Sequence, residues 1–515
     1  MQKLKLKMFF LVVLFCGIFG LMEDSHAEEL YIAQNVSGSD TGADCVNAHS
    51  VSWLNTSGNW GSGTNKISAG DTAHLCGTFS SPITIQGSGT SESPITIFFE
   101  TGAKMSKNHW YQSGSNGDAA IYGSNKSYIT IDGGTNGLIE ATDNGTARTF
   151  QYDIAGVFFN NGSNVTVKNL AVYPLYERVE GTDANNICIG IGFDGISTNL
   201  TLQDNILKDA SNGMYIGYRA GSSGAEISGN VCDDCGHSCV TVGSQNTNET
   251  MSDVQIHDNT FHKSRKWSGA PEIHTNLIHA WAVHEGSRLE GLEIYSNNFS
   301  GMCGTNSTAL VFLEGYIYSP EIYNNVLVKE VDPDGACGNG LMNLKGSNYA
   351  VVANNTFIGL DGGLSLQVGG WGGGMDIGHI IKNNLIYNTS FVVEPYDYDA
   401  VAQCDYNVYY GDGVFSYGSW AQYDFAGWKA ATASHGYNFD AHSTVSQPTL
   451  DANYASTATD VVAKDHGVSL SSYFTADNLG VPRPQGSAWD IGAYEYVSGE
   501  SDMTAPGAPS GLMVD

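Results

Sequence analysis

Charged and helix-favouring residues are scarce in this chain, and their scarcity excludes several classes of protein. Only 15% of the 515 residues are charged, with 22 Lys and Arg against 53 Asp and Glu, for a formal net charge of −31. Proline occurs 12 times, whereas glycine occurs 63 times and asparagine outnumbers lysine and arginine together. Such a composition argues against a helical protein, and a hydrophobic fraction of 41% argues against disorder. A large β protein with many turns remains, and its acidity argues against nucleic acid as a partner.

Long apolar stretches are also missing, apart from one at the N-terminus. A basic start precedes an apolar run over 8–22, and a small-residue cleavage site ends at Ala27. This pattern predicts a secretory signal peptide over 1–27. A lipoprotein signal at Cys16 is the less favoured alternative, because the preceding Phe15 is bulky. No later stretch reaches the roughly 18 apolar residues that a membrane span needs. We therefore expect a secreted or cell-surface monomer.

Nine cysteines follow the signal peptide, and export favours disulfides among them. Their odd number leaves at least one free or paired elsewhere. The predicted pairs are Cys45 with Cys76, both in the N-terminal segment, and Cys303 with Cys337, about one repeat apart. The trio Cys232, Cys235 and Cys239 is interpreted as a disulfide and a buried thiol. A zinc site that includes His237 is less favoured, because no second ligand pair lies at a suitable spacing.

An imperfect repeat organises the middle of the chain. Each copy is an alternating apolar strand that ends in Asn, followed by one or two apolar residues. The copies end at Asn205, Asn230, Asn259, Asn297, Asn325, Asn355 and Asn384. A strand and turn that recur at this interval predict a solenoid, in which each coil pairs with the coils above and below. The recurring Asn predicts a left-handed turn residue whose amide bonds the Asn of the next coil, forming a ladder.

A second strand recurs between the Asn positions and ends at Gly, as in Cys239-Val-Thr-Val-Gly243 and Leu310-Val-Phe-Leu-Glu314-Gly315. Two or three strands per coil with short turns describe an all-β, right-handed parallel β-helix solenoid. Over about residues 30–497 the chain resembles the superfamily of secreted right-handed parallel β-helix proteins, to which pectate-lyase-like enzymes belong. The resemblance implies this fold but no single activity, because the superfamily holds lyases, hydrolases, epimerases and adhesins.

The composition along the chain predicts its domain organisation. After the signal peptide we expect an N-terminal cap with the first coils over 28–100, because a solenoid must cover its open end. The parallel β-helix core is expected over 101–400, and the last coils with a closing segment over 401–497. Residues 498–515 resemble a linker and the start of a fibronectin type III module.

The longest repeat interval lies between Asn259 and Asn297, and it holds an unusual local cluster of basic and aromatic residues. An inserted loop on a rigid scaffold commonly carries function. We expect His274 and His279 to act as acid and base. Lys263 and Arg265 are predicted to hold an anionic group, and Trp267 and Trp281 to stack on sugar rings. The alternative is that the cations only neutralise neighbouring carboxylates.

Aligning the glycines that end the second strands places Glu285, Glu314 and Lys345 in one column on consecutive coils, with Arg219 near it. Paired carboxylates suit a glycoside hydrolase, whereas flanking cations suit a lyase that neutralises a uronate. An ordinary outward ladder of charges is the alternative. No cofactor is indicated with certainty; Ca²⁺ fits the acidic surface better than zinc at His274 and His279, although no recognised calcium motif is present.

These features predict a secreted carbohydrate-active protein that acts on an extracellular polysaccharide along a groove of the solenoid. Elimination by a polysaccharide lyase is preferred because of the local cluster of cations. A glycoside hydrolase on the same fold is the first alternative. A non-catalytic adhesin or glycan-binding structural protein is the second.

Overall fold

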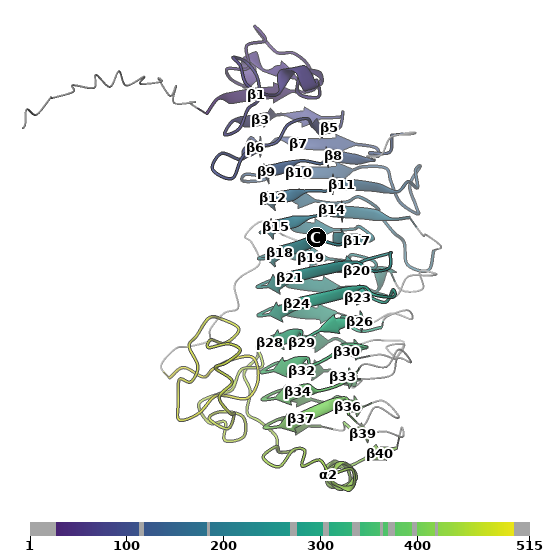
Figure 1. Cartoon of the computed structure of the whole chain (residues 1–515), viewed down its shortest axis with the longest axis vertical. Helices are drawn as coiled ribbons and strands as arrows, with labels where there is room; N and C mark the ends of the chain where they lie inside the picture. The colour runs from purple at the N-terminus through teal and green to yellow at the C-terminus, as the bar shows by residue number, and fades with distance from the viewer. Residues whose placement is uncertain are drawn as a thin grey trace, which may run out of the picture.

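The chain forms a tall stack of coils in which each strand pairs with the equivalent strand of the coils above and below (Figure 1). The computed structural model describes residues 27–112, 118–182, 186–267, 275–301, 308–331, 340–360, 364–368, 376–393, 399–411, 413–417 and 421–498. Within these ranges the strands form three sheets, and every strand pairing is parallel except β39 with β40. The protein is a right-handed parallel β-helix, as its sequence repeat predicts.

The first sheet carries the strands that precede the Asn turns. In spatial order within the described chain these are β2 (His49–Ser50), β1 (Glu29–Ala33), β3 (Thr72–Cys76), β6 (Ile95–Phe99), β9 (Ser127–Asp132), β12 (Ser163–Lys168), β15 (Thr198–Gln203), β18 (Ser222–Ser228), β21 (Thr250–His257), β24 (Arg288–Tyr295), β28 (Glu321–Tyr323), β31 (Val351–Ala353), β34 (His379–Lys382) and β37 (Val401–Asp405). The short strand β27 (Ile317–Tyr318) also pairs with β24.

The second sheet carries the short strands that follow the Asn turns. In chain order these are β4 (Thr78–Phe79), β7 (Lys104–Lys107), β10 (Leu138–Ala141), β13 (Ala171–Val172), β16 (Ile206–Lys208), β19 (Val231–Asp233), β22 (Thr260–Lys263), β25 (Asn298–Gly301), β29 (Val326–Lys329), β32 (Thr356–Gly359), β35 (Leu385–Tyr387) and β38 (Val408–Tyr410).

The third sheet carries the strands that often end at Gly. In chain order these are β5 (Ile83–Ile85), β8 (Ala119–Ser124), β11 (Ile154–Asn160), β14 (Cys188–Gly195), β17 (Asn212–Tyr218), β20 (Ser238–Gly243), β23 (Ile278–Ala282), β26 (Val311–Gly315), β30 (Met342–Lys345), β33 (Leu364–Val368), β36 (Ser390–Val393), β39 (Phe415–Tyr417) and β40 (Gln422–Tyr423).

The interior of the coils is filled by columns of apolar side chains. One column on the first sheet runs through Val167, Leu202, Ile227, Ile256 and Ile294, which pair in register and are fully buried. The residues between them point outward, as strand alternation requires. Because every coil buries the same face, the stack has one continuous core.

A ladder of buried asparagines runs along the turns between the first and second sheets. Each Asn before the last donates from its backbone N and from its side-chain Nδ2 to the Oδ1 of the Asn in the next coil, as Asn259 does to Asn297 at 3.1 and 2.9 Å. The rungs are Asn205, Asn230, Asn259, Asn297, Asn325, Asn355, Asn384 and Asn407. The predicted ladder is therefore confirmed.

The residue that bends the chain at each rung is not the one expected. The rung asparagines lie outside the left-handed region, and the residue before each rung occupies it, as Asp204, Asp258 and Asn324 do with φ of 54°, 56° and 56°. The bend and the ladder are thus divided between two consecutive residues. Asn and Asp tolerate this conformation better than other non-glycine residues.

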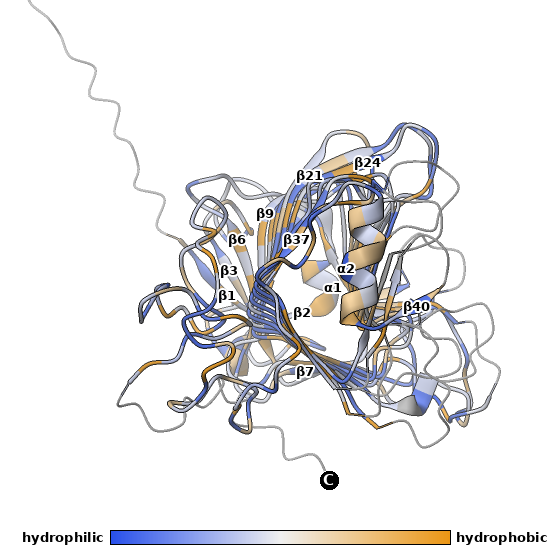
Figure 2. Ribbon diagram, turned by 90° about the horizontal axis from the view of Figure 1, so that it is seen from below, coloured by the Kyte–Doolittle hydropathy of each residue, from blue (hydrophilic) through white to orange (hydrophobic). Residues whose placement is uncertain are grey.

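Both ends of the stack are covered. At the N-terminal end, α1 (Val51–Leu54) and the 3₁₀ turns η1 (Cys45–Asn47) and η2 (Ser57–Asn59) lie beside the first coils, where a disulfide joins Cys45 to Cys76. At the other end, α2 (Phe425–Ser434) lies across the last coil (Figure 2). Neither of these helices has the length that crossing a bilayer would take, nor does any other described helix.

The segment over 440–498 does not add further coils but returns along the outside of the stack, drawn in yellow in Figure 1. It docks on the outward asparagines that precede three rungs. Asn324 donates to Ala476 O, Asn354 to Asp490 O, and Asn383 to Val468 O, each at 2.8 Å. The sequence carries a double Asn at these three coils, and the first Asn of each pair binds this segment. The expected fibronectin-like start lies almost wholly outside the described residues.

Three further cysteines are brought together in the middle of the stack. A disulfide joins Cys232 on β19 to Cys239 on β20, and the thiol of Cys235 is buried between them. Among the described residues this trio is the single group of three side chains whose metal-ligand atoms lie within 4.8 Å of one another. The predicted pair of Cys303 and Cys337 falls outside the described residues.

Candidate active site

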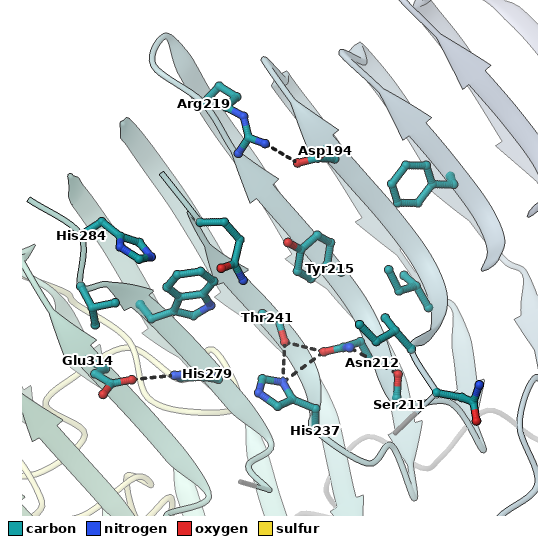
Figure 3. A pocket seen from close by; sticks show the side chains of 17 residues that line it. Asp194, Ser211, Asn212, Tyr215, Arg219, His237, Thr241, His279, His284 and Glu314 are labelled. Atoms are coloured by element: carbon teal, nitrogen blue, oxygen red, sulfur yellow. Dashed lines mark hydrogen bonds and ion pairs between the residues drawn. The ribbon is translucent and has the colours of Figure 1, made fainter. Parts of the chain in front are cut away.

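A cleft of about 720 Å³ opens on the outer face of the third sheet, across β14, β17, β20, β23 and β26 (Figure 3). Outward side chains on these strands fall into register columns. Tyr215, Thr241 and His279 form one column on consecutive coils. The remaining described lining residues are Phe158, Asn186, Ile187, Ile189, Asp194, Ser211, Asn212, Arg219, His237, Gln245, Trp281, Val283, His284 and Glu314.

Glycines give the larger side chains of the cleft room to lie flat against the neighbouring coil. A Cβ on Gly243 would lie 2.0 Å from the indole of Trp281, which is paired with it in register. A Cβ on Gly217 would lie 2.8 Å from both the Tyr215 hydroxyl and the Asp194 carboxylate. Outward glycines in these strands therefore shape the floor of the cleft, which explains why Gly recurs there.

The His237 ring is oriented by hydrogen bonds on one of its nitrogens. Its Nδ1 lies 3.2 Å from Asn212 Oδ1 and 3.4 Å from Thr241 Oγ1. Thr241 Oγ1 also donates to Asn212 Oδ1 at 2.8 Å. Because an amide oxygen only accepts, this arrangement places the proton of a neutral ring on Nδ1 and makes Nε2 the basic nitrogen.

A second histidine lies beside the first. The rings of His279 and His237 have centroids 5.2 Å apart, and His279 Nε2 lies 3.4 Å from Glu314 Oε2. His279 is buried and stacks on the ring of Phe312. The two imidazole rings and the Glu314 carboxylate thus form one cluster in the cleft.

A phenol and an ion pair complete the other end of the cleft. Burial, together with the Asp194 carboxylate, raises the pKa of the Tyr215 hydroxyl above its ordinary value. Arg219 Nη2 lies 3.5 Å from Asp194 Oδ1, and both side chains are about one-third exposed. Tyr215 thus stays protonated at neutral pH, and Arg219 offers a guanidinium to the cleft.

The predicted site residues divide between the cleft and the core. His279, Glu314, Trp281 and Arg219 line the cleft. Lys263 and Trp267 do not, because both are buried beneath it, so their prediction as anion-holding and sugar-stacking residues is wrong. Lys263 follows Phe261 with strand alternation and therefore points inward with it. His274 and the side chain of Arg265 lie outside the described residues.

The predicted column of Glu285, Glu314 and Lys345 is wrong for Glu285, because the strands pair in a different register. Glu314 pairs with Lys345, but its partner on the preceding coil is Trp281 and not Glu285. Glu285 lies beyond the end of β23, in a longer turn that packs on residues near Asn248 of the coil above. Gly286 and Gly315 are therefore not equivalent positions. Lys345 is not among the residues that line the cleft.

Asp194, Asn212, Tyr215 and His237 are among the polar residues of the cleft that were not predicted to line it from the sequence. Arg219 lies four positions after Tyr215, just past the end of β17. Strand alternation alone would therefore have placed both side chains outward. His237 precedes its strand and gave no periodic signal. The described carboxylates of the cleft, Asp194 and Glu314, lie four strands apart, so they cannot gather around one calcium ion.

No protein-family profile matches the chain, and no curated protein matches its sequence. Among solved structures, a GH136 lacto-N-biosidase from Eubacterium ramulus is 12% identical with a TM-score of 0.42, over 76% of this chain and 66% of that one. An alginate lyase from Paenibacillus sp. is 14% identical with a TM-score of 0.39, over 61% and 95%. The surface adhesin PfbA of Streptococcus pneumoniae is 14% identical with a TM-score of 0.38, over 64% and 78%.

Proposed function

We propose that the protein is a polysaccharide lyase that cleaves an extracellular uronate-containing glycan by β-elimination in the cleft of the third sheet. The observation that carries this proposal is the grouping of two histidines, a protonated tyrosine and an arginine in one cleft. Elimination next to a uronate carboxylate needs a base for the C5 proton, an acid for the leaving O4, and positive charge near the carboxylate. Each of these has a candidate among the described residues.

His237 is the proposed base. Its Nδ1 faces Asn212 Oδ1, so Nε2 is the nitrogen proposed to accept the C5 proton. Tyr215 is the proposed acid, because its hydroxyl is protonated at neutral pH and can donate to the O4 of the leaving sugar. The electron pair of the C5–H bond forms the C4–C5 double bond as the C4–O4 bond breaks.

Arg219 and the histidines of the cleft support an anionic substrate. The protein as a whole is strongly acidic, so local cationic groups are needed to hold a uronate. Arg219 supplies a guanidinium, and His279 adds positive charge when its ring is protonated. Bringing a carboxylate near such groups stabilises the enolate-like charge that builds up as the proton leaves.

Hydrolysis by two carboxylates has less support from the described residues. Retaining and inverting glycosidases place their carboxyl groups about 5 to 9.5 Å apart. Asp194 and Glu314 lie on strands four apart, which corresponds to about 19 Å at about 4.8 Å per strand. These two groups therefore cannot act on one glycosidic bond.

The test is a panel of polyuronates and neutral glycans incubated with the mature protein. Absorbance at 235 nm reports the unsaturated uronate, and a reducing-end assay reports cleavage of any kind. We expect both signals on at least one polyuronate. Reducing ends without absorbance would replace the lyase by a hydrolase, and retained binding with neither signal would favour a non-catalytic glycan-binding protein.

A further inference from the structure

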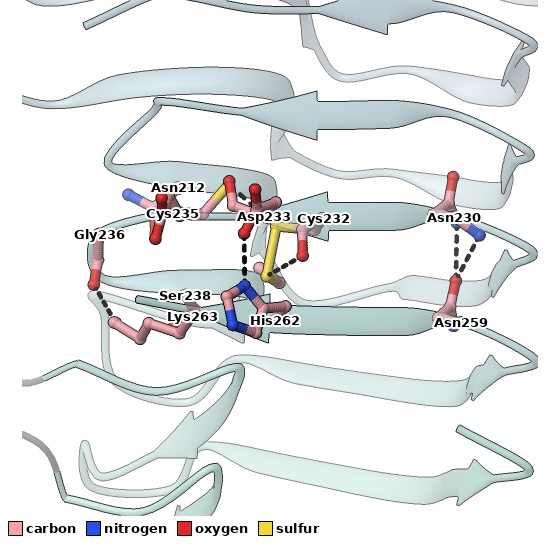
Figure 4. Close-up of a disulfide and its surroundings, with 12 residues drawn as sticks. Asn212, Asn230, Cys232, Asp233, Cys235, Gly236, Ser238, Asn259, His262 and Lys263 are labelled. Carbon is pink, nitrogen blue, oxygen red and sulfur yellow. Dashed lines mark hydrogen bonds and ion pairs between the residues drawn. A yellow bond between two sulfur atoms is a disulfide. The ribbon is translucent and has the colours of Figure 1, made fainter. Parts of the chain in front are cut away.

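Lys263 and Trp267 lie in the core, but both contact the turn that joins β19 to β20 and carries His237. Figure 4 shows Lys263 reaching Gly236 of this turn. Lys263 Nζ donates to Gly236 O at 2.6 Å, and Trp267 Nε1 donates to Asp234 O at 2.9 Å. The indole ring covers Gly236 so closely that a Cβ there would lie 2.3 Å from it. Two long side chains from the following coil thus hold one short turn.

The backbone of the same turn is bonded to the coils on both sides. Gly236 N donates to Ala210 O at 2.8 Å and His237 N donates to Ser211 O at 2.6 Å, both on the preceding coil. His237 O accepts from Asn276 N at 2.8 Å on the following coil. The disulfide between Cys232 and Cys239 closes the loop from which the turn is made. The backbone at His237 is therefore held by both neighbouring coils, and Asn212 and Thr241 then orient its ring.

Lys263 is an energetically unfavourable residue for a buried core position. Lys263 is 3% exposed, and burial lowers the pKa of its amine to about 7. Desolvating an amine costs more than burying an apolar side chain of similar length. Met would be expected to give a more stable core at this position. The hydrogen bond from Lys263 to Gly236 O therefore indicates that this carbonyl, and His237 after it, must be held in place.

We propose that Lys263 is a positioning residue for His237, which fixes the turn so that the imidazole stays against Asn212 and Thr241. This inference rests on the proposed function, in which His237 is the base. Lys263 does not touch the cleft and acts only through the turn. Its removal lets the turn relax and moves the basic nitrogen from its place, while the rest of the lining stays.

The chain offers a matched control for this proposal. Lys329 is also buried, at 4% exposure, and holds the same register position of the second sheet two coils further on, through Gly301. We compare Lys263→Met with Lys329→Met on the polyuronate that the wild-type protein cleaves. For Lys263→Met we expect kcat to fall at least tenfold with KM within about twofold, because substrate binding is retained. Lys329→Met should keep kcat within about twofold.

A second readout does not depend on activity. In protein labelled at the histidine Cε1 position, the His237 resonance is assigned from its loss in His237→Gln. We expect it to shift or broaden in Lys263→Met and to stay in place in Lys329→Met. If no glycan is cleaved, the proposed function fails, and the NMR comparison still decides the positioning role.

The proposal is overturned if Lys263→Met leaves both the His237 resonance and kcat unchanged, or if Lys329→Met causes the same loss. Should Lys263→Met not fold, Gly236→Ala displaces the same turn from the side of Trp267. Gly236→Ala is then expected to shift the His237 resonance and to lower kcat with KM retained. If it does not, the proposal is refuted.

Discussion

At the scale of single residues, the chemistry of the cleft depends on which groups hold protons. Asn212 Oδ1 orients His237, Glu314 accompanies His279, and burial keeps Tyr215 protonated. Neither Asn212 nor Glu314 is adjacent in sequence to the histidine that it contacts. Register between coils brings them together, so one substitution in a neighbouring strand can change the protonation of a catalytic group.

Replacing the proposed acid tests this arrangement with little change in shape. For Tyr215→Phe we expect kcat to fall about 10²- to 10⁴-fold, the usual contribution of a general acid, with little change in KM. Tyr122→Phe, on β8 at the same register position three coils earlier and outside the cleft, is the matched control. An unchanged kcat in Tyr215→Phe would exclude the phenol as the acid.

The buried amine of Lys263 gives a second prediction at this scale. Its pKa is about 7 in the folded protein and about 10.4 when unfolded. Between these values the unfolded chain binds the extra proton, so this residue makes the free energy of unfolding rise with pH, by at most about 1.4 kcal/mol per unit. Denaturant unfolding at pH 7.5 and 9.5 should show this rise in the wild type. A rise of the same size in Lys263→Met would contradict the assignment.

At the scale of secondary structure, the Asn ladder carries several buried hydrogen bonds per coil. Asn297 donates to Ile256 O, Tyr295 O and Asn325 Oδ1, and its own Oδ1 accepts both donors of Asn259. Removing one rung leaves buried groups on two coils without partners. Each such group costs about 1 to 3 kcal/mol.

Asn297→Ala is therefore expected to destabilise the protein by about 3 to 5 kcal/mol, since at least two donors of Asn259 lose their acceptor. The next residue provides the control, because Asn298 is partly exposed on β25 and is not a rung. Asn298→Ala should change the free energy of unfolding by no more than about 0.5 kcal/mol. Denaturant midpoints of both variants decide the matter, and equal midpoints would mean that the ladder contributes little.

The repeating strands could be predicted from the sequence, whereas the register that depends on turn length could not. The strands before Asn205 to Asn384 follow from alternation and spacing alone. The column through Glu314 was predicted in the wrong register, because the turn that follows β23 is longer than the turn that follows β26. Gly286 and Gly315 were aligned although they are not equivalent positions. Lys263 was assigned to the surface by its charge, although its parity with Phe261 indicated the core. His237 is fixed by contacts between coils, which no local pattern encodes.

At the scale of the whole molecule, the C-terminal segment clamps the outside of the coils. Arg483 is fully buried, pairs with Glu495 at 2.7 Å and donates to Asn324 Oδ1 at 3.0 Å. It thus joins the closing segment to the turn of an earlier coil. The cleft lies on a different sheet, so docking of this segment and binding of substrate are separate properties.

Arg483→Met should loosen the segment without altering catalysis. It leaves the buried Glu495 without its cation, which typically costs about 3 to 5 kcal/mol. We expect brief proteolysis to release fragments from 440–498 while the coils remain intact and kcat stays near the wild-type value. Arg288→Met, at an exposed position, is the control. Resistance to proteolysis equal to that of the wild type would show that the ion pair does not hold the segment.

The central claim is that His237 in this cleft removes a proton from a uronate. It is tested most directly by the rate of absorbance increase at 235 nm, measured on one polyuronate for the wild type, His237→Gln and His442→Gln. His442 is an exposed histidine near β37, outside the lining of the cleft. We expect a loss of at least about 10²-fold for His237→Gln and a wild-type rate for His442→Gln. Equal rates for all three proteins would contradict it.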